Sequence, residues 1–134
     1  MNQKIMAIIY SEKSNFLLLR TNPKWMKVDV WFIVTGSIEK GETEKDTVKR
    51  EIKEETNLTI LDIKQTDYSC KYENPTGRWN NEKAFLVKVK ESIPTLSGEH
   101  TEYVWLTKKE FIEKIDWDEK IDSKDKLKEI LLSI

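Results

Sequence analysis

The sequence predicts an α/β fold in which a mixed β-sheet is flanked by helices. Short apolar runs rich in β-branched and aromatic residues occur before, between and after stretches of helical periodicity. The chain has 134 residues and contains no repeat, low-complexity tract or Pro/Gly-rich linker, so residues 1–134 are expected to form one domain of ordinary size. Strands that alternate with helices inside one domain are typical of a sheet covered by helices.

Six segments have the composition of β-strands. The first is a continuous apolar run, which indicates a strand covered on both faces. Turn-forming residues separate the runs, most clearly at Asn74–Gly77. The predicted strands are Ile5–Tyr10, Phe16–Leu19, Val28–Val34, Leu58–Ile63 with a looser continuation to Tyr72, Ala84–Val89 and Tyr103–Leu106.

The longest predicted helix covers Thr43–Thr56, which lacks Gly and Pro and places Val48 and Ile52 four residues apart. Thr43 is suited to cap its N-terminus, with Asp46 three residues later.

Two shorter helices are predicted near the end of the chain. Thr107 and Glu110 have capping-box spacing, which predicts a helix over Lys108–Ile115. Ser123 is expected to cap a last amphipathic helix that extends through Leu131.

Composition argues against several classes of function. The formal net charge is −1, with interleaved Lys and Glu, so no basic field is present to hold a nucleic-acid backbone. The lone Cys70 excludes an internal disulfide and a cysteine-based zinc site, and we expect a half-buried structural thiol. The apolar run after the first residues is too short for a signal peptide or a membrane span, so a cytoplasmic protein without a membrane partner is expected.

Three glutamates gather on one flank of the predicted helix over Thr43–Thr56. Glu51 and Glu55 lie about 40° apart around the helix axis, and Glu54 lies about 60° to the other side of Glu51. Three like charges beside a buried stripe repel one another and lose solvation, and a divalent cation would offset both effects. Ordinary exposed glutamates on a charged helix remain the alternative explanation.

The residues around these glutamates resemble the Nudix box. That motif is a Gly, five residues, Glu, seven residues, Arg-Glu, an aliphatic residue, any residue, Glu-Glu, any residue, Gly and an aliphatic residue. Every defined position matches over residues 36–58 except the last glycine, which is Asn57. Asn is the commonest substitute for Gly in the left-handed conformation just past a helix, so the loop–helix–loop shape should persist. The matching positions are Gly36, Glu42, Arg50, Glu51, Ile52, Glu54, Glu55 and Leu58.

The resemblance implies a Nudix-type α/β/α sandwich and a metal-dependent hydrolase of phosphoanhydrides. By this resemblance Glu51 and Glu55 are metal ligands, Glu54 is a further ligand or the catalytic base, and Gly36 offers its backbone carbonyl to the metal. Carboxylate oxygens favour Mg²⁺, with Mn²⁺ as the possible substitute. The cation would neutralise the phosphate chain and activate water.

Arg50 is expected to support catalysis without touching the substrate. By the resemblance it pairs with Glu54 or Glu42 and holds a carboxylate in place.

Family members often take one more carboxylate from a late loop. Glu99, shortly before the strand that ends near Trp105, is the predicted ligand, and Glu102 is its competitor. His100 is expected to be a surface histidine rather than the general base.

A narrower resemblance is to the dihydroneopterin triphosphate pyrophosphohydrolase branch of the family. It rests on Trp31 followed by Val-Thr-Gly-Ser at 34–37, on Leu18-Leu19-Arg20, and on Glu99-His100 ahead of Trp105. That branch releases pyrophosphate and a monophosphate, and also accepts nucleoside triphosphates. The resemblance implies substrate contacts by Arg20, as a phosphate clamp, and by Thr35.

The tryptophans offer candidates for stacking a pterin or purine ring. Trp79 lies in a polar loop and is the preferred candidate, ahead of Trp25 and Trp31. The alternative for a tryptophan in a small domain is a place in the core or at its rim, and Trp79 could equally pack at a dimer interface.

Two other functions stay open. One is hydrolysis of another nucleoside diphosphate derivative, such as a dinucleoside polyphosphate, an ADP-sugar or a capped RNA. The other is a non-catalytic nucleotide-binding module, which the retention of all four box glutamates argues against. In each case the partner is a small phosphoanhydride, and the protein is a monomer or a homodimer.

Overall fold

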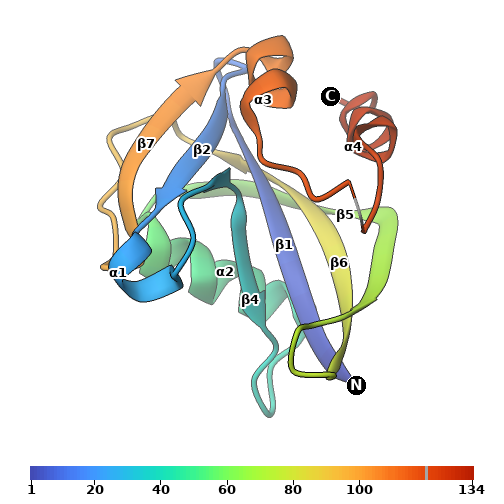
Figure 1. Cartoon of the computed structure of the whole chain (residues 1–134). Coiled ribbons are helices and arrows are strands. Elements are labelled where there is room, and N and C mark those ends of the chain that lie inside the picture. The colour runs from blue at the N-terminus through green and yellow to red at the C-terminus, as the bar shows by residue number, and fades with distance from the viewer. Residues whose placement is uncertain (120) are drawn as a thin grey trace.

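The computed structural model describes residues 1–119 and 121–134 as a seven-stranded mixed sheet with helices on both faces (Figure 1). The sheet order is β3-β2-β1-β6-β5, while β4 pairs with β1 and β7 pairs with β2. This confirms the predicted fold class. The elements are β1 (Asn2–Ser11), β2 (Phe16–Thr21), α1 (Pro23–Met26), β3 (Trp31–Phe32), β4 (Val34–Ser37), α2 (Glu44–Glu55), β5 (Ile60–Glu73), β6 (Trp79–Val89), β7 (His100–Leu106), α3 (Lys108–Lys114) and α4 (Lys124–Leu131).

The strand β1 forms the centre of the sheet. It runs parallel to β6 along its whole length, from Asn2 opposite Asn80 to Ser11 opposite Val89. On its other side its first half pairs with β4 and its end pairs with β2, both antiparallel. The apolar run Ile5–Ile9 is buried throughout, as predicted for a strand covered on both faces.

Side chains alternate along the strands and fill two cores. On one face Ile5, Ala7 and Ile9 of β1 pack with Val48 and Ile52 of α2. The opposite core contains Met6 and Ile8 of β1 together with apolar residues of α3 and α4. Figure 1 shows the same division, with α2 on one side of the sheet and α3 and α4 on the other. Within each of β1, β4 and β6, residues two apart therefore point to the same face of the sheet, and neighbouring residues point to opposite faces.

The ends of α2 follow the predicted local chemistry. The Thr43 hydroxyl accepts a hydrogen bond from the Asp46 amide at 3.1 Å, and the Asp46 carboxylate accepts one from the Thr43 amide at 3.0 Å. This is the predicted capping box. Just past the helix, Asn57 has φ 54°, the left-handed conformation expected where the motif has its last glycine.

The strand predicted over Val28–Val34 is wrong in its bounds. Asn22 caps a short helix, α1, whose first residue is Pro23, and the chain then forms two separate strands, β3 and β4. The separation arises because β3 pairs with β2 whereas β4 pairs with β1, so the chain changes partner between Phe32 and Val34.

Three smaller expectations also need correction. Ser123 precedes α4 but its side chain makes no capping hydrogen bond. Cys70 is buried rather than half-buried. Trp79 is the first residue of β6 rather than part of a loop. Within the described residues, no helix combines the length and apolar character needed to cross a membrane.

Candidate active site

At the candidate site, β4 and α2 approach each other closely at Gly36 and Glu51. Gly36 lies opposite Ile5 in the sheet and faces the Glu51 side chain. A Cβ atom at Gly36 would lie only 2.4 Å from both Cδ and Oε1 of Glu51. A glycine is therefore required here to let the carboxylate lie against the β4 backbone.

The three glutamates of α2 converge as their spacing predicted. One carboxylate oxygen each from Glu51, Glu54 and Glu55 lies within 4.8 Å of the others. The Glu51 and Glu55 side chains are only 13% and 7% exposed, whereas that of Glu54 is 54% exposed. Two of the three are thus far more buried than ordinary glutamates on a solvated helix.

The electrostatics of this group fit a cation. Burial raises the pKa of Glu51, the charges of Glu54 and Glu55 raise it further, and Arg50 acts against them. A divalent ion among these oxygens would relieve both the desolvation and the repulsion, and hard oxygen donors suit Mg²⁺ or Mn²⁺. These oxygen donors therefore fit the metal that the sequence predicts.

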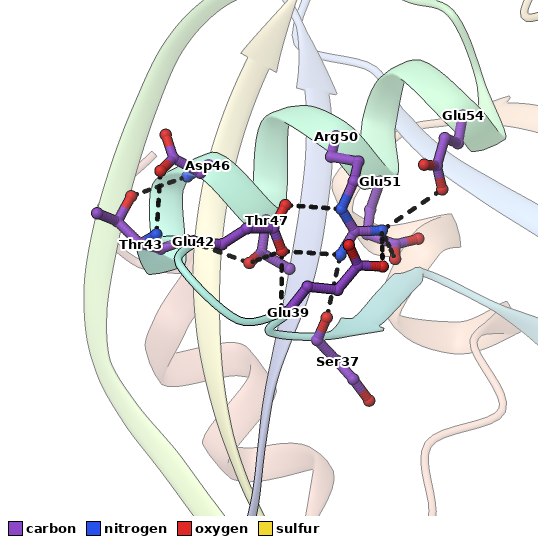
Figure 2. Close-up of polar contacts among 9 residues, drawn as sticks. All are labelled: Ser37, Glu39, Glu42, Thr43, Asp46, Thr47, Arg50, Glu51 and Glu54. Carbon is purple, nitrogen blue, oxygen red and sulfur yellow. Dashed lines mark hydrogen bonds and ion pairs between the residues drawn. The ribbon is translucent and has the colours of Figure 1, made fainter.

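Arg50 organises the carboxylates around it (Figure 2). Its guanidinium donates two hydrogen bonds to Glu42, at 2.7 and 3.0 Å, and one to Glu51 at 2.8 Å. It also lies 3.5 Å from Glu54 and donates to the Ser37 carbonyl at 3.0 Å. Arg50 therefore contacts both predicted partners, Glu42 and Glu54. Its hydrogen bonds to Ser37 and Glu42 also connect the loop before α2 to that helix.

The hydrogen bond from Arg50, with a further one from the Glu39 amide, lowers the pKa of Glu42 to about 2. Glu42 therefore stays ionised and is committed to Arg50 and Thr47, which donates a hydrogen bond to it at 3.0 Å. It holds the arginine in place and leaves Glu51, Glu54 and Glu55 as the oxygens available to a ligand.

The Glu55 carboxylate is held from the loop before β7. Its Oε2 accepts a hydrogen bond from the Ser97 hydroxyl at 2.6 Å and lies 3.0 Å from Nδ1 of His100. Burial alone would raise the pKa of Glu55, but the hydrogen bonds from His100 and Ser97 outweigh burial, so the pKa is lowered. The expectation of a surface histidine is wrong, since the His100 side chain is 10% exposed and directed at Glu55.

The same loop brings Glu99 to the site. Burial and the neighbouring charge of Glu55 raise the pKa of Glu99, which places the two carboxyl groups close together. Its competitor Glu102 is paired with Arg20 instead. The structure thus brings Glu99, rather than Glu102, beside the glutamates of α2.

The two predicted substrate contacts on β2 and β4 have different surroundings. The guanidinium of Arg20 donates two hydrogen bonds to Asp29, each 2.8 Å, and one to Glu102 at 2.5 Å. A phosphate would have to displace a carboxylate to bind there. Thr35, opposite Met6, lies on the face of the sheet away from α2.

Trp79 is exposed, as predicted, but lies apart from the glutamates. It begins β6 on the α2 face, four residues before Lys83, which pairs with Glu44 at the N-terminal end of α2. The glutamate group lies in the C-terminal half of that helix. Its stacking role stays a prediction.

Sequence reasoning missed Ser97 and the orientation of His100. Both reach Glu55 across more than 40 residues of chain. Only the resemblance that singled out Glu99 and His100 pointed to this loop.

Comparison with known proteins agrees with this geometry. A family model described as the NUDIX domain matches residues 2–126. A dihydroneopterin triphosphate diphosphatase of Haemophilus influenzae is 33% identical over 127 residues, which cover 84% of this chain and 78% of that protein.

Solved structures share the fold. The C. elegans Ap4A hydrolase is 25% identical over the whole of both chains, with a TM-score of 0.74. The E. coli dihydroneopterin triphosphate pyrophosphohydrolase is 22% identical, with a TM-score of 0.72 over 96% of this chain and 94% of that one. The chain therefore belongs to the Nudix family and is a Nudix pyrophosphohydrolase.

Proposed function

We propose that this enzyme uses Mg²⁺ to hydrolyse dihydroneopterin triphosphate or a nucleoside triphosphate to the monophosphate and pyrophosphate. The observation that carries the proposal is the convergence of Glu51, Glu54 and Glu55, with Glu99 beside them. Relatives named dihydroneopterin triphosphate diphosphatase support the choice of substrate.

In this proposal Glu51, Glu55 and Glu99, with the Gly36 carbonyl, hold the cation, and Glu54 is a further ligand or the base. The bound cation supplies charge neutralisation for the phosphate chain and lowers the pKa of water. The water oxygen attacks phosphorus, the bridging P–O bond breaks, and pyrophosphate leaves. Glu54 is the box glutamate most open to solvent, so it is the one best placed to take the proton from water.

The remaining residues of the site act by holding these carboxylates. Arg50 contacts Glu51 and Glu54 from one side, while Ser97 and His100 hold Glu55 from the other. Fixed carboxylates keep the ligand set in one geometry before substrate arrives, which reduces the reorganisation needed during reaction.

A second candidate is hydrolysis of a dinucleoside polyphosphate. The similarity to the C. elegans Ap4A hydrolase, over the whole of both chains, favours it. The proposed ligands would be the same, and only the contacts to the organic group would differ.

A substrate panel separates the candidates. With Mg²⁺ present, kcat/KM is measured for dihydroneopterin triphosphate, GTP, ATP, Ap4A and ADP-ribose. We expect dihydroneopterin triphosphate to have the highest value. A higher value for Ap4A would favour the second candidate, and no turnover of any compound by folded protein would contradict both.

A further inference from the structure

The first residue of β7 lies on the opposite face of the sheet from the one that strand alternation predicts. Tyr103 packs against the core beneath α2, and Val104 packs against the opposite core. Because side chains alternate along a strand, His100, four residues before Val104, is expected on the face away from α2. It lies on the α2 face instead, with its Nδ1 3.0 Å from Oε2 of Glu55. The alternation therefore changes between His100 and Tyr103.

The change is a β-bulge at Thr101. Arg20 of β2 pairs with Glu102 of β7. The next residue of β2, Thr21, pairs with His100, so Thr101 is left as an extra residue between the two pairs. One extra residue reverses the face that the preceding side chains reach. The bulge therefore accounts for the orientation of His100 toward α2.

Asn22 holds the backbone on the far side of this bulge. Its amide donates a hydrogen bond to the Glu99 carbonyl at 2.8 Å, and its side-chain Nδ2 donates one to the Gly98 carbonyl at 2.9 Å. Ser97 holds the same stretch from the other side, because its hydroxyl accepts a hydrogen bond from the Glu99 amide at 3.2 Å and donates one to Glu55 at 2.6 Å. The backbone of Glu99 is thus held at both its N–H and its C=O.

The same asparagine begins α1. Its Oδ1 accepts a hydrogen bond from the Lys24 amide at 3.1 Å, and the ring of Trp25 lies 3.9 Å from where a Cβ atom at Gly98 would be. Figure 1 shows α1 beside the start of β7. Asp and Ser cap helices as well as Asn does, so the helix alone does not require Asn here. Asp lacks a donor for the Gly98 carbonyl, and the side chain of Ser is shorter.

We propose that Asn22 is a positioning residue for the metal site, which holds the bulge and so presents Glu99 and His100 to the carboxylates of α2. The inference rests on the proposed metal-dependent hydrolysis and extends it to a residue outside the Nudix box. Asn22 acts through the backbone of Glu99 and touches neither the cation nor the substrate. Its loss should weaken metal binding more than the chemical step, because the ligands remain but are held less firmly.

Asn22→Ser tests this role, since serine keeps a cap for α1 and removes the Nδ2 donor. We expect the Mg²⁺ concentration for half-maximal activity to rise about tenfold or more, on the scale that follows loss of a group that orients a metal ligand. At saturating Mg²⁺, kcat should return to within about threefold of wild type, because excess metal restores the occupied site.

Asn74→Ser is the matched control. The Asn74 side chain accepts hydrogen bonds from the Thr76 amide, the Thr76 hydroxyl and the Arg78 amide in the turn between β5 and β6. This variant should lower the melting temperature and leave the Mg²⁺ dependence unchanged. If Asn22→Ser does the same, Asn22 serves only the fold.

Two measurements without turnover separate this inference from the proposed function. Titration of the substrate-free protein with Mn²⁺, followed by EPR, should show about tenfold weaker binding in Asn22→Ser. In EDTA, NMR should show faster amide exchange at Glu99 and His100 in the variant, with the amides of α2 unchanged. If the wild type hydrolyses no triphosphate but both differences appear, the proposed function fails and the positioning role stands.

Three results would overturn the proposal. The first is an unchanged Mn²⁺ affinity in folded Asn22→Ser. The second is weaker Mn²⁺ binding with unchanged amide exchange at Glu99 and His100, because the effect would then not act through this loop. The third is a wild type that binds no Mn²⁺, which would leave no metal site for Asn22 to position.

Discussion

Glu55→Gln is expected to lower kcat by about a hundredfold or more, on the scale that follows loss of a metal-site group. Glutamine keeps the shape of the side chain and one oxygen that can accept the Ser97 hydrogen bond. It removes the negative charge that the proposed cation requires. Activity should therefore fall while the fold persists.

Metal binding provides the second readout for this variant. MgCl₂ should raise the melting temperature of the wild type by mass action, and raise that of Glu55→Gln much less. Glu44→Gln is the matched control, because it removes one charge from the same helix but contacts Lys83 rather than the glutamate group. Its activity should stay within about twofold of wild type, since it loses only a helix-terminal charge and a partly exposed ion pair. Full activity in Glu55→Gln would refute the assignment of this residue.

Gly36→Ala is the second substitution with a large expected effect. The new methyl group would collide with the Glu51 side chain at 2.4 Å, so the carboxylate must move. Displacing a catalytic group by about 1 Å can cost on the order of a hundredfold in rate. We expect a loss of that order in kcat and weaker Mg²⁺ binding, with little change in melting temperature, because the flexible end of Glu51 can turn aside.

Gly77→Ala separates this effect from ordinary loss of a glycine. Gly77 has φ +82°, so alanine there strains the backbone of a hairpin turn remote from the glutamates. This control should lower the melting temperature and leave kcat unchanged. If Gly36→Ala also lowers the melting temperature and leaves kcat unchanged, the close approach of Glu51 to β4 has no role in catalysis.

The glutamate cluster could be predicted because its geometry is local. The helix period alone brings Glu51, Glu54 and Glu55 together, and the capping box at Thr43 fixes where that helix begins. The left-handed conformation of Asn57 is likewise local, because it ends the last turn of the helix that precedes it.

Contacts made across the chain could not be predicted in this way. Spacing says nothing about His100, which reaches Glu55 only after β7 pairs with β2. The split between β3 and β4 depends on which neighbour each strand finds.

The most direct test of the catalytic proposal follows the products of dihydroneopterin triphosphate by ³¹P NMR in the presence of Mg²⁺. We expect equal amounts of pyrophosphate and the monophosphate, no reaction in EDTA, and recovery when Mg²⁺ is restored. Release of orthophosphate with the diphosphate left behind, or hydrolysis that continues unchanged in EDTA, would contradict it.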